Sequence, residues 1–595
     1  MRGMLTKLKK VKFVLIATFF SFYFYGAHGE QLDDKSKIIK KVDVAVYGAT
    51  PSGILAAMAV KREGKSVIII EPSKWVGGIL GSGIKPLQDM AHFPPIGGTT
   101  RNLMLTLGVN SDAEKSELEN ALAEFSDHTR TDRGDIFQNF YKIIGAMSPK
   151  KIRNDFVNIL NEYDIDVIYS HRLNYVKKER QRIKSGIFDF APFDEVGLPP
   201  EASKVPEHLE VEAAMFIDAS YEGELMARSG VSFRVGREST SDYNEELAGV
   251  RPFGNITPIS PFIVPDDPNS GLLPLVENDD GKPIGASDQY VQAYNYRFYV
   301  TTDSKRKAVI EPPEDYRAMD YELVGRYVDY LKQASKSQSE LFENLRSIFP
   351  GWLNAGEYNY QRASLITIAP LGISHLYADG DYATKARVWK AHQDYLRGLH
   401  HFLSTDKRVP EKFRKETANL GLAKDYFPDT HGWPNQLYLR ESRRMIGRYI
   451  LTAHDVYNRT DVEDPIGLAQ YGIDTYPARR IWFKRDGAIF VAIEGNMFIG
   501  GDRGPTNVPY AIPYRAITPK RNEATNLLVS VTFSASHLGY ASARMEPTFM
   551  IVGESAGVAA AQALDENVPV QDINMARYLK KLNALGQRLD WEKVK

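Results

Sequence analysis

The residues with the most specific chemistry lie near the start of the chain, in a turn of small residues and just beyond it. They are Gly48, Thr50, Ser52, Gly53 and Glu71. A helix that begins at such a turn offers unpaired backbone N–H groups and the positive end of its dipole to an anion. Gly48 permits a sharp exit from a strand, Gly53 lets the helix lie close to the sheet, and Glu71 is placed to accept hydrogen bonds from a ribose. Together they predict a dinucleotide site with its pyrophosphate on the turn.

The elements around this turn are those that such a site needs. Residues 42–47 and 66–70 are apolar runs of strand type, and the Ala-rich segment 54–63 between them is typical of a helix. This order predicts a βαβ unit. The glycine fingerprint is imperfect, because Thr50 stands where a second glycine is usual, and an ordinary βαβ turn is the structural alternative.

Lys74, Gly77 and Gly78 follow Glu71 closely and could close a second loop on the same pyrophosphate. This pairing of a ribose acid with a glycine pair resembles flavoproteins of the glutathione-reductase type, in which it marks FAD. A nicotinamide dehydrogenase is the less favoured alternative.

Two later segments are expected to return to the nucleotide. The strand-type run 210–217 ends at Asp218, which we expect beside the cofactor, with an ordinary turn as the alternative. Gly553, Ser555 and Gly557 are expected to open an Ala-rich helix over residues 558–564. A helix start aimed at reduced flavin would favour its negative charge, and a packing helix is the alternative.

Proton transfer accompanies hydride transfer, and a histidine near the flavin could supply it. The candidates are His537, just before the C-terminal helix, and His431, beside Trp433. Each can also be a structural histidine held by hydrogen bonds.

Arginines recur every four residues at Arg440, Arg444 and Arg448, and on a helix they would share one face. That face is either solvated and ion-paired, or it holds a polar or anionic substrate or the pyrimidine edge of the flavin. Arg440 is the arginine that we name as a catalytic candidate.

The sequence is similar to FAD-dependent oxidoreductases whose nucleotide domain is of the glutathione-reductase and para-hydroxybenzoate-hydroxylase kind. The segments that carry the resemblance are 48–53, 71, 77–78, 217–227, 236–239, 291–297, 437–449, 512–520 and 534–564. The resemblance implies FAD as the cofactor and an α/β fold, with a Rossmann-like FAD-binding domain assembled from discontinuous segments and an inserted α+β substrate domain.

The expected organisation follows from these segments and from the N-terminus. Basic residues, an apolar run at 13–25 and small residues at 27–29 are typical of a signal peptide, and 13 residues are too few to span a bilayer comfortably. A retained membrane anchor is the alternative. We expect a signal peptide (1–29), a tether (30–41), the FAD-binding domain in two parts (42–230 and 511–595) and the substrate domain (231–510).

Composition excludes several classes of chemistry. With no cysteine in 595 residues, disulfides, thiolate catalysis and cysteine-ligated metals are excluded, so likeness to glutathione reductase ends at the nucleotide fold. No HExxH motif or paired-histidine spacing predicts a metal site, and no nucleophile elbow predicts a serine hydrolase. A formal net charge of −1 gives no reason to expect nucleic acid as a partner.

The sequence therefore predicts an exported FAD-dependent oxidoreductase, secreted or periplasmic, without a stable membrane span after signal cleavage. It would transfer a hydride between FAD and a small polar substrate, and the aromatic residues of the middle section favour a carbohydrate-derived molecule. The electron acceptor is not identified. The alternative from another class is a lyase, hydrolase or binding protein that keeps FAD as a structural or non-redox group.

Overall fold

The computed structural model describes residues 37–88, 93–126, 133–351, 357–358, 364–500 and 508–593. The expected signal peptide and most of the tether lie outside the described residues. The end of the tether is a correction, because β1 (Ile38–Tyr47) begins at Ile38 and not at Val42. Its first four side chains are exposed, which makes the sequence look like a linker, while its backbone already pairs with β6 (Val205–Asp218) from Ile38 opposite Leu209.

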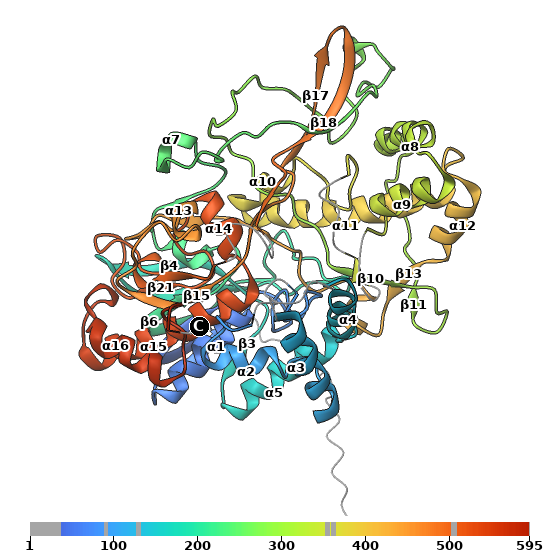
Figure 1. The fold of residues 1–595 in the computed structure, drawn as a ribbon. Coiled ribbons are helices and arrows are strands. Elements are labelled where there is room, and N and C mark those ends of the chain that lie inside the picture. The colour runs from blue at the N-terminus through green and yellow to red at the C-terminus, as the bar shows by residue number, and fades with distance from the viewer. Residues whose placement is uncertain are drawn as a thin grey trace, which may run out of the picture. The chain divides into compact units, whose positions relative to one another are not determined.

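The largest sheet is built from both ends of the chain (Figure 1). Its strand order is β3 (Asp166–Ile168), β2 (Val67–Ile70), β1, β6, β5 (Arg182–Phe190) and β4 (His171–Glu179). The long strand β6 pairs antiparallel with β5 through its first half and parallel with β21 (Leu527–Val529) through its last residues. The C-terminal segment thereby joins the sheet of the N-terminal βαβ unit, and the predicted parallel α/β sheet is confirmed.

The predicted helix of the βαβ unit is confirmed as α1 (Pro51–Arg62), which begins earlier than its apolar run indicated. Its residues are buried continuously from Pro51 to Val60. They lie between the sheet and α15 (Glu546–Glu566), which itself is buried from Glu546 to Ala563. A helix enclosed on all sides can be apolar all round, which explains the weak periodicity of both sequences.

Between β2 and β3 the described residues form four helices, and the apolar spacing within residues 112–125, 135–147 and 151–165 predicts three of them. They are α2 (Gly98–Met104), α3 (Asp112–Ser126), α4 (Arg133–Gly145) and α5 (Pro149–Glu162). A short helix, α6 (Glu224–Arg228), follows β6.

Residues 231–510 contribute short strands and a set of helices. The helices are α7 (Thr240–Tyr243), α8 (Glu322–Ala334), α9 (Gln338–Ile348), α10 (Ser374–Ala378), α11 (Tyr382–Thr405), α12 (Glu411–Asn419) and α13 (Ala453–Val456). The strands up to residue 445 are β7 (Phe233–Arg234), β8 (Gly254–Thr257), β9 (Glu277–Asn278), β10 (Phe298–Thr301), β11 (Lys307–Ala308), β12 (Glu357–Tyr358), β13 (Gly421–Ala423) and β14 (Arg444–Met445). Those beyond are β15 (Pro465–Ala469), β16 (Ile473–Thr475), β17 (Arg479–Arg485), β18 (Ala488–Glu494) and β19 (Met497–Ile499).

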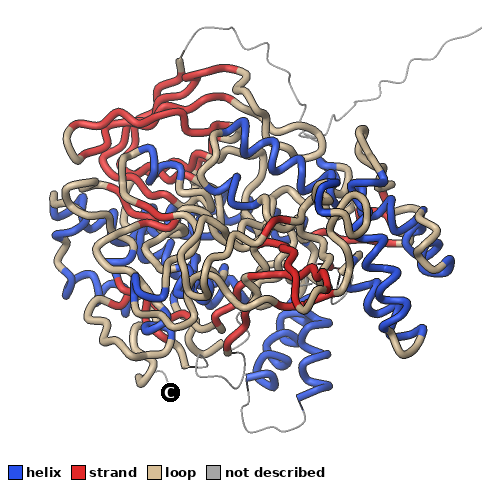
Figure 2. The backbone as a smooth tube through the Cα atoms, turned by 90° about the horizontal axis from the view of Figure 1, so that it is seen from above, coloured by secondary structure: helices blue, strands red, loops and turns tan. Residues whose placement is uncertain are grey.

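Strands β17 and β18 form a long antiparallel ribbon at the top of Figure 1 and share a four-stranded sheet with β8 and β9. Loops and turns, tan in Figure 2, make up much of the chain between these elements. After them, β20 (Tyr510–Pro513) pairs with β15, and the C-terminal helices are α14 (His537–Ala543), α15 and α16 (Met575–Ala584).

Residues Lys37–Lys595 form one compact unit. Its largest hydrophobic cluster includes Ile54 of α1, Val552 of α15 and Leu399 of α11. The division into an FAD-binding and a substrate domain at residues 230 and 510 stays a prediction. Within the described residues, no helix combines the length and apolar character that crossing a bilayer requires.

Candidate active site

The turn between β1 and α1 has the tight geometry that its glycines predicted. Gly48 has a φ of +101°, and a Cβ there would lie 2.9 Å from the carbonyl oxygen of Ala219. A Cβ on Gly53 would lie 2.0 Å from the carbonyl oxygen of Gly48. Both positions therefore exclude a side chain, and the first turn of α1 stays close against the end of β6.

Thr50 has a structural use that a second glycine could not supply. Its side-chain oxygen accepts a hydrogen bond from the backbone N–H of Gly53 at 3.2 Å, so Thr50 is the N-cap of α1. The same hydroxyl donates to the carbonyl oxygen of Ala219 at 2.8 Å. Ser52, two residues after Thr50, is buried, and its Oγ donates a hydrogen bond to Ser530 Oγ at 2.9 Å. The departure from the glycine fingerprint thus ties the turn to β6.

Glu71 lies beside the turn, as predicted. Its Oε2 accepts a hydrogen bond from the N–H of Ala49 at 2.7 Å, and its Oε1 accepts one from the N–H of Ser73 at 2.8 Å. Burial raises the pKa of the Glu71 carboxyl, and these hydrogen bonds act against that increase. The carboxylate is thus held at the end of β2, where it faces the start of α1.

The second loop also reaches the turn. The N–H of Gly77 donates to the carbonyl oxygen of Ala49 at 2.8 Å. Gly78 has a φ of +45°, and a Cβ there would lie 2.4 Å from the hydroxyl of Tyr221. Lys74 is exposed at the edge of this loop. The structure therefore brings Gly48, Gly53, Glu71 and Gly77 together, with Lys74 outside the contacts.

Asp218 ends β6 next to the turn, but its carboxylate organises the following loop. It is buried and accepts hydrogen bonds from the N–H and Oγ of Ser220 and from the N–H of Met226. Burial raises its pKa to about 6, against the effect of these hydrogen bonds. Asp218 thus ends the strand as expected, but its carboxylate is bonded to Ser220 and to the backbone of α6, and its place beside the cofactor stays a prediction.

The expected helix start at Gly553 is wrong, because this residue lies in the middle of α15. A Cβ on Gly553 would lie 2.1 Å from the carbonyl oxygen of Ser52, and one on Gly557 would lie 2.3 Å from that of Ala56. Ser555 donates a hydrogen bond to the carbonyl oxygen of Ile466. The two glycines therefore let α15 pack closely on α1, which is the packing alternative, and the helix dipole begins at Glu546 instead.

The N-terminus of α15 borders a small pocket that the sequence did not reveal. It is lined by Ile79, Ile84, Tyr221, Leu437, Tyr438, Leu439, Arg544, Glu546 and Phe549. The hydroxyl of Tyr221 accepts a hydrogen bond from the N–H of Ile79 at 3.0 Å and donates to Glu546 Oε1 at 2.7 Å. The second glycine loop and the start of α15 therefore meet at Tyr221.

His537 lies in a buried ionic network that is connected to this pocket along the chain, because Leu439 lines the pocket and Glu441 pairs with His537. Its Nδ1 is 2.8 Å from Glu441 Oε2, and its backbone N–H donates to Glu238 Oε2 at 2.8 Å. Arg444 bridges the two acids, at 2.7 Å from Glu238 and 3.3 Å from Glu441. No residue in the described part of the chain makes a hydrogen bond to Nε2 of His537. The histidine is thus fixed through one nitrogen and has the other available.

Glu441 has a pKa below its ordinary value. Burial raises its pKa, but the neighbouring His537, the hydrogen bond from it and the charge of Arg444 outweigh that effect and bring the pKa to about 2. The carboxylate is therefore charged at neutral pH and orients the imidazole. The signal that could have found Glu441 is its place as the single acidic residue among the four arginines of the run 437–449.

The predicted arginine helix is wrong: the segment is not helical, and Arg444 and Met445 form strand β14 with β7. Arg444 is fully buried and ion-paired, as the ion-pairing alternative predicted, and Arg448 is exposed. Arg440 is buried against Tyr438 and Tyr476. The segment around Arg440 and Arg444 is therefore buried and not helical, whereas the spacing indicated a helix with the arginines on one face.

His431 is not brought to this network. It is exposed, and it ends a short 3-10 turn in the left-handed conformation, with a φ of 53°. Of the two histidine candidates, only His537 shares buried contacts with charged groups.

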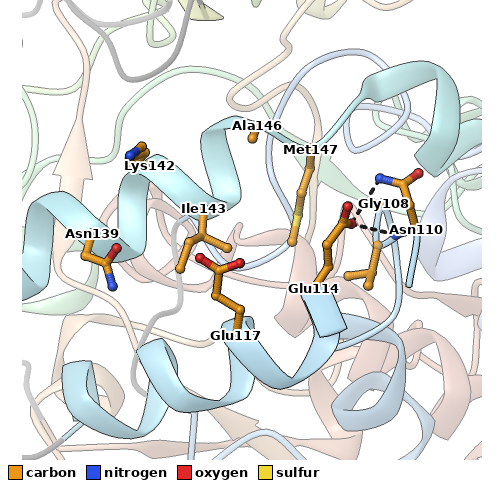
Figure 3. A pocket seen from close by; sticks show the side chains of 10 residues that line it. Gly108, Asn110, Glu114, Glu117, Asn139, Lys142, Ile143, Ala146 and Met147 are labelled. Carbon is orange, nitrogen blue, oxygen red and sulfur yellow. Dashed lines mark hydrogen bonds between the residues drawn. The ribbon is translucent and has the colours of Figure 1, made fainter. Parts of the chain in front are cut away.

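A second pocket lies between α3 and α4 and is wider (Figure 3). Glu117 of α3 points toward Ile143 and Asn139 of α4, and Glu114 accepts hydrogen bonds from Asn110. Lys142 of α4 also lines the pocket. These charged side chains are exposed, and no predicted site residue lines the pocket. It is therefore separate from the candidate active site.

Comparison with known proteins agrees with this geometry. Residues 43–583 match the family model described as FAD dependent oxidoreductase, so the chain belongs to that family. FAD is accordingly its cofactor, and the protein is an FAD-dependent oxidoreductase. No curated protein matches the sequence.

Solved structures match over about a third of the chain. A geranylgeranyl bacteriochlorophyll reductase-like protein from Thermoplasma acidophilum is 16% identical over 33% of this chain and 43% of its own, with a TM-score of 0.19. L-proline dehydrogenase from P. horikoshii is 15% identical over 36% and 27%, with a TM-score of 0.17. A flavin-containing monooxygenase from Stenotrophomonas maltophilia is 14% identical over 36% and 44%, with a TM-score of 0.19. The chain spans less than half the length of each.

The residues present fit this cofactor. The start of α1 has no side chain at Gly48 or Gly53 that would keep a diphosphate away, and the positive end of the helix lies there. The N–H of Gly53 is already bonded to Thr50, and Pro51 has none, so the helix dipole is the main attraction for the anion. Glu71 is held where a ribose acid is needed. The predicted cofactor, FAD, is confirmed by the family match over the nicotinamide alternative. The Gly77–Gly78 loop is the second backbone element that would hold it.

Proposed function

We propose that this protein is an exported oxidoreductase that moves a hydride between a small polar substrate and FAD, with His537 as the acid–base residue. The observation that carries the proposal is the meeting of three segments at one pocket: the second glycine loop, residues 437–439 and the N-terminus of α15. The positive end of that helix favours negative charge in the pocket.

FAD, when bound, supplies the hydride acceptor or donor. In the oxidative direction Nε2 of His537 would accept the proton of an alcohol substrate, whose hydride the bound cofactor would take up, and the product would be a carbonyl compound. Glu441 holds the other nitrogen, Nδ1, and its negative charge stabilises the imidazolium that forms. Arg444 and Gln292 hold Glu441 in place through its two oxygens.

A carbohydrate-derived molecule is the substrate class that the aromatic middle section favours, because sugar rings stack on aromatic faces. The test is anaerobic incubation of the holoenzyme with a panel of sugars and sugar acids while the visible flavin absorbance is followed. Bleaching by one member supports the proposal. If no reductant or substrate other than dithionite bleaches the flavin, FAD has a non-redox role and the lyase, hydrolase or binding alternative replaces it.

The two histidines give a matched pair of variants. Because a positioned acid–base group contributes roughly 10²–10⁴-fold, His537→Gln is expected to slow flavin reduction by substrate at least a hundredfold. His431→Gln, an exposed position, is expected to reduce the flavin at the wild-type rate. Equal rates for both variants would remove His537 from the mechanism.

Export is supported by the basic residues, apolar run and small residues of the first 29 positions. N-terminal sequencing of the protein recovered from cells that express the full chain is expected to begin near Glu30. A protein that retains residues 1–29 and stays with the cytoplasmic fraction would contradict export without affecting the redox proposal.

A further inference from the structure

Three buried guanidinium groups surround the ring of Tyr438. The centres of Arg297, Arg440 and Arg544 lie 4.8, 4.7 and 6.0 Å from the ring centroid. Their residues are only 3%, 5% and 6% exposed. Arg440 also lies over Tyr476 at 3.9 Å. Aromatic faces attract cations, but such contacts are worth only about 2 kcal/mol when desolvated, much less than the cost of burying a charge.

Arg440 differs from its neighbours in the chain by its partners. Arg443 is paired with Glu224 at 2.9 Å, and Arg444 with Glu238 at 2.7 Å. No ion pair found among the described residues includes Arg440, whose Nη1 donates only to the carbonyl oxygen of Ala293. Its other two nitrogens have no hydrogen-bond partner in the part of the chain that the structure describes. Arg440 thus has N–H groups that could donate hydrogen bonds to a ligand.

The electrostatics of the cluster point the same way. The pKa of Arg440 is lowered to about 10, chiefly by burial and also by the charges of Arg544 and Arg297, against the opposite effect of Tyr438 and Tyr476. Asp474, 3.9 Å from Arg544, and Glu546, which lines the pocket, offset part of the repulsion among these like charges. An anion bound at Arg440, which has no such partner among the described residues, would reduce it further.

The cluster adjoins the pocket of the proposed active site. Tyr438, Leu439 and Arg544 line that pocket, and Arg544 immediately precedes the start of α15. Arg544 also donates to the hydroxyl of Tyr438 at 2.8 Å. Arg297 is joined to the loop after Gly78, since a Cβ on Gly83 would lie 2.5 Å from its carbonyl oxygen. A helix N-terminus adds its positive end to this field.

We propose that the substrate carries a carboxylate, which Arg440 and Arg544 bind beside Tyr438. This proposal rests on the proposed function, because it assigns the substrate class of that same pocket. A guanidinium matches a carboxylate with two parallel N–H donors, and Arg440 supplies the unused donors. Arg297 adds charge that favours an anion over a neutral molecule of the same shape. Among carbohydrate-derived molecules, the sugar acids therefore fit and the neutral sugars do not.

The first test compares matched probes by titration calorimetry on the holoenzyme. The carboxylates are acetate, lactate and glucuronate, and their neutral counterparts are ethanol, propane-1,2-diol and glucose. At least one carboxylate is expected to bind tenfold or more tightly than its counterpart, with an affinity that falls as salt rises. If no carboxylate binds more tightly than its counterpart, the proposal is overturned.

The second test uses variants of the same segment. Arg440→Gln is expected to weaken carboxylate binding at least tenfold, and Arg440→Lys, which keeps the charge but not the paired donors, is expected to fall between it and the wild type. Arg448→Gln, at an exposed position, is the matched control and is expected to bind like the wild type. Unchanged carboxylate binding in Arg440→Gln, with its FAD still bound, would overturn the assignment.

Calorimetry, combined with the flavin absorbance, separates the proposed anion site from the proposed hydride transfer. Carboxylate binding without bleaching of the flavin by any probe would count against hydride transfer and support the anion site. Bleaching by a neutral sugar that Arg440→Gln does not affect would support hydride transfer and overturn the anion site.

Discussion

The carboxylate of Glu71 illustrates how one residue can serve both fold and ligand. It accepts hydrogen bonds from the N–H groups of Ala49 and Ser73, which fix the ends of β1 and β2 against each other. A ribose would have to share or displace those bonds, so FAD binding and the shape of the turn are coupled at this side chain.

Replacing Glu71 by Gln is expected to weaken FAD binding by about 2 kcal/mol, roughly 30-fold, because an amide is a poorer acceptor than a charged carboxylate. Fluorescence titration of the apoprotein with FAD measures the change. Glu162→Gln, at an exposed helix end, is the matched control and should bind FAD like the wild type. Unaltered affinity in Glu71→Gln would show that the ribose lies elsewhere.

Glu441 gives a prediction with a defined dependence on pH. Its pKa of about 2 in the folded protein lies below the ordinary value of about 4.3. The stabilisation it provides is therefore complete above about pH 4.3 and is lost as the pH falls towards 2. Glu441→Gln breaks a buried pair and is expected to lower the free energy of unfolding by about 3 kcal/mol at pH 7. Urea unfolding should show this difference shrinking at pH 3, and a constant difference would contradict it.

Helices α1 and α15 are the pair of elements on which the cofactor site depends. The glycines at 553 and 557 bring α15 against the backbone of α1 at Ser52 and Ala56. The start of α1 forms the phosphate turn, and the start of α15 borders the pocket. A change in their separation would therefore affect both ends of the cofactor.

Gly557→Val is expected to destabilise the protein by about 1–3 kcal/mol through overpacking, and to reduce the FAD that remains bound after purification. The reason is that its Cβ would lie 2.3 Å from the carbonyl oxygen of Ala56. Gly254→Val in β8 is the matched control, because a Cβ there has its nearest neighbour at 3.7 Å. Thermal unfolding and flavin absorbance measure both effects, and full flavin content in Gly557→Val would contradict the coupling of the two helices.

Sequence patterns predicted the elements whose signals are local. The βαβ unit, α3, α4 and α5 were predicted because turn residues and apolar periodicity lie within each segment. The start of α15 was missed because small residues at 553–557 are also typical of a turn, and only contact with Ser52 and Ala56, some 500 positions away, distinguishes the two. The Arg440–Arg448 helix failed because spacing alone carries no information on burial. The pocket formed by Tyr221, Glu546 and Arg544 depends on tertiary contacts that no local pattern contains.

The N-terminal and C-terminal parts of the chain together form the proposed cofactor site. Strand β21 extends the sheet beside β6, and α15 covers α1, so residues 511–593 complete what residues 37–230 begin. The segment between them supplies Leu437, Tyr438 and Leu439 to the pocket, and Glu441 to the side chain of His537. Function therefore depends on the entire chain and not on its N-terminal nucleotide unit alone.

A chain that ends at residue 510 is expected to be insoluble or to lack FAD, because α1 would lose the apolar cover of α15 and β6 would lose its partner β21. Size-exclusion chromatography with absorbance detection measures both properties. A soluble truncated chain with one FAD would contradict the dependence on the C-terminal segment.

The most direct test of the account is the FAD content of the purified protein and of two glycine-to-alanine variants. The wild type is expected to hold one FAD per chain. Gly53→Ala, whose Cβ would lie 2.0 Å from the carbonyl oxygen of Gly48, should hold less than about a tenth of that amount, whereas Gly254→Ala should match the wild type. A colourless wild-type protein that takes up no added FAD, or full FAD content in Gly53→Ala, would contradict the claim that the cofactor's diphosphate lies at the start of α1.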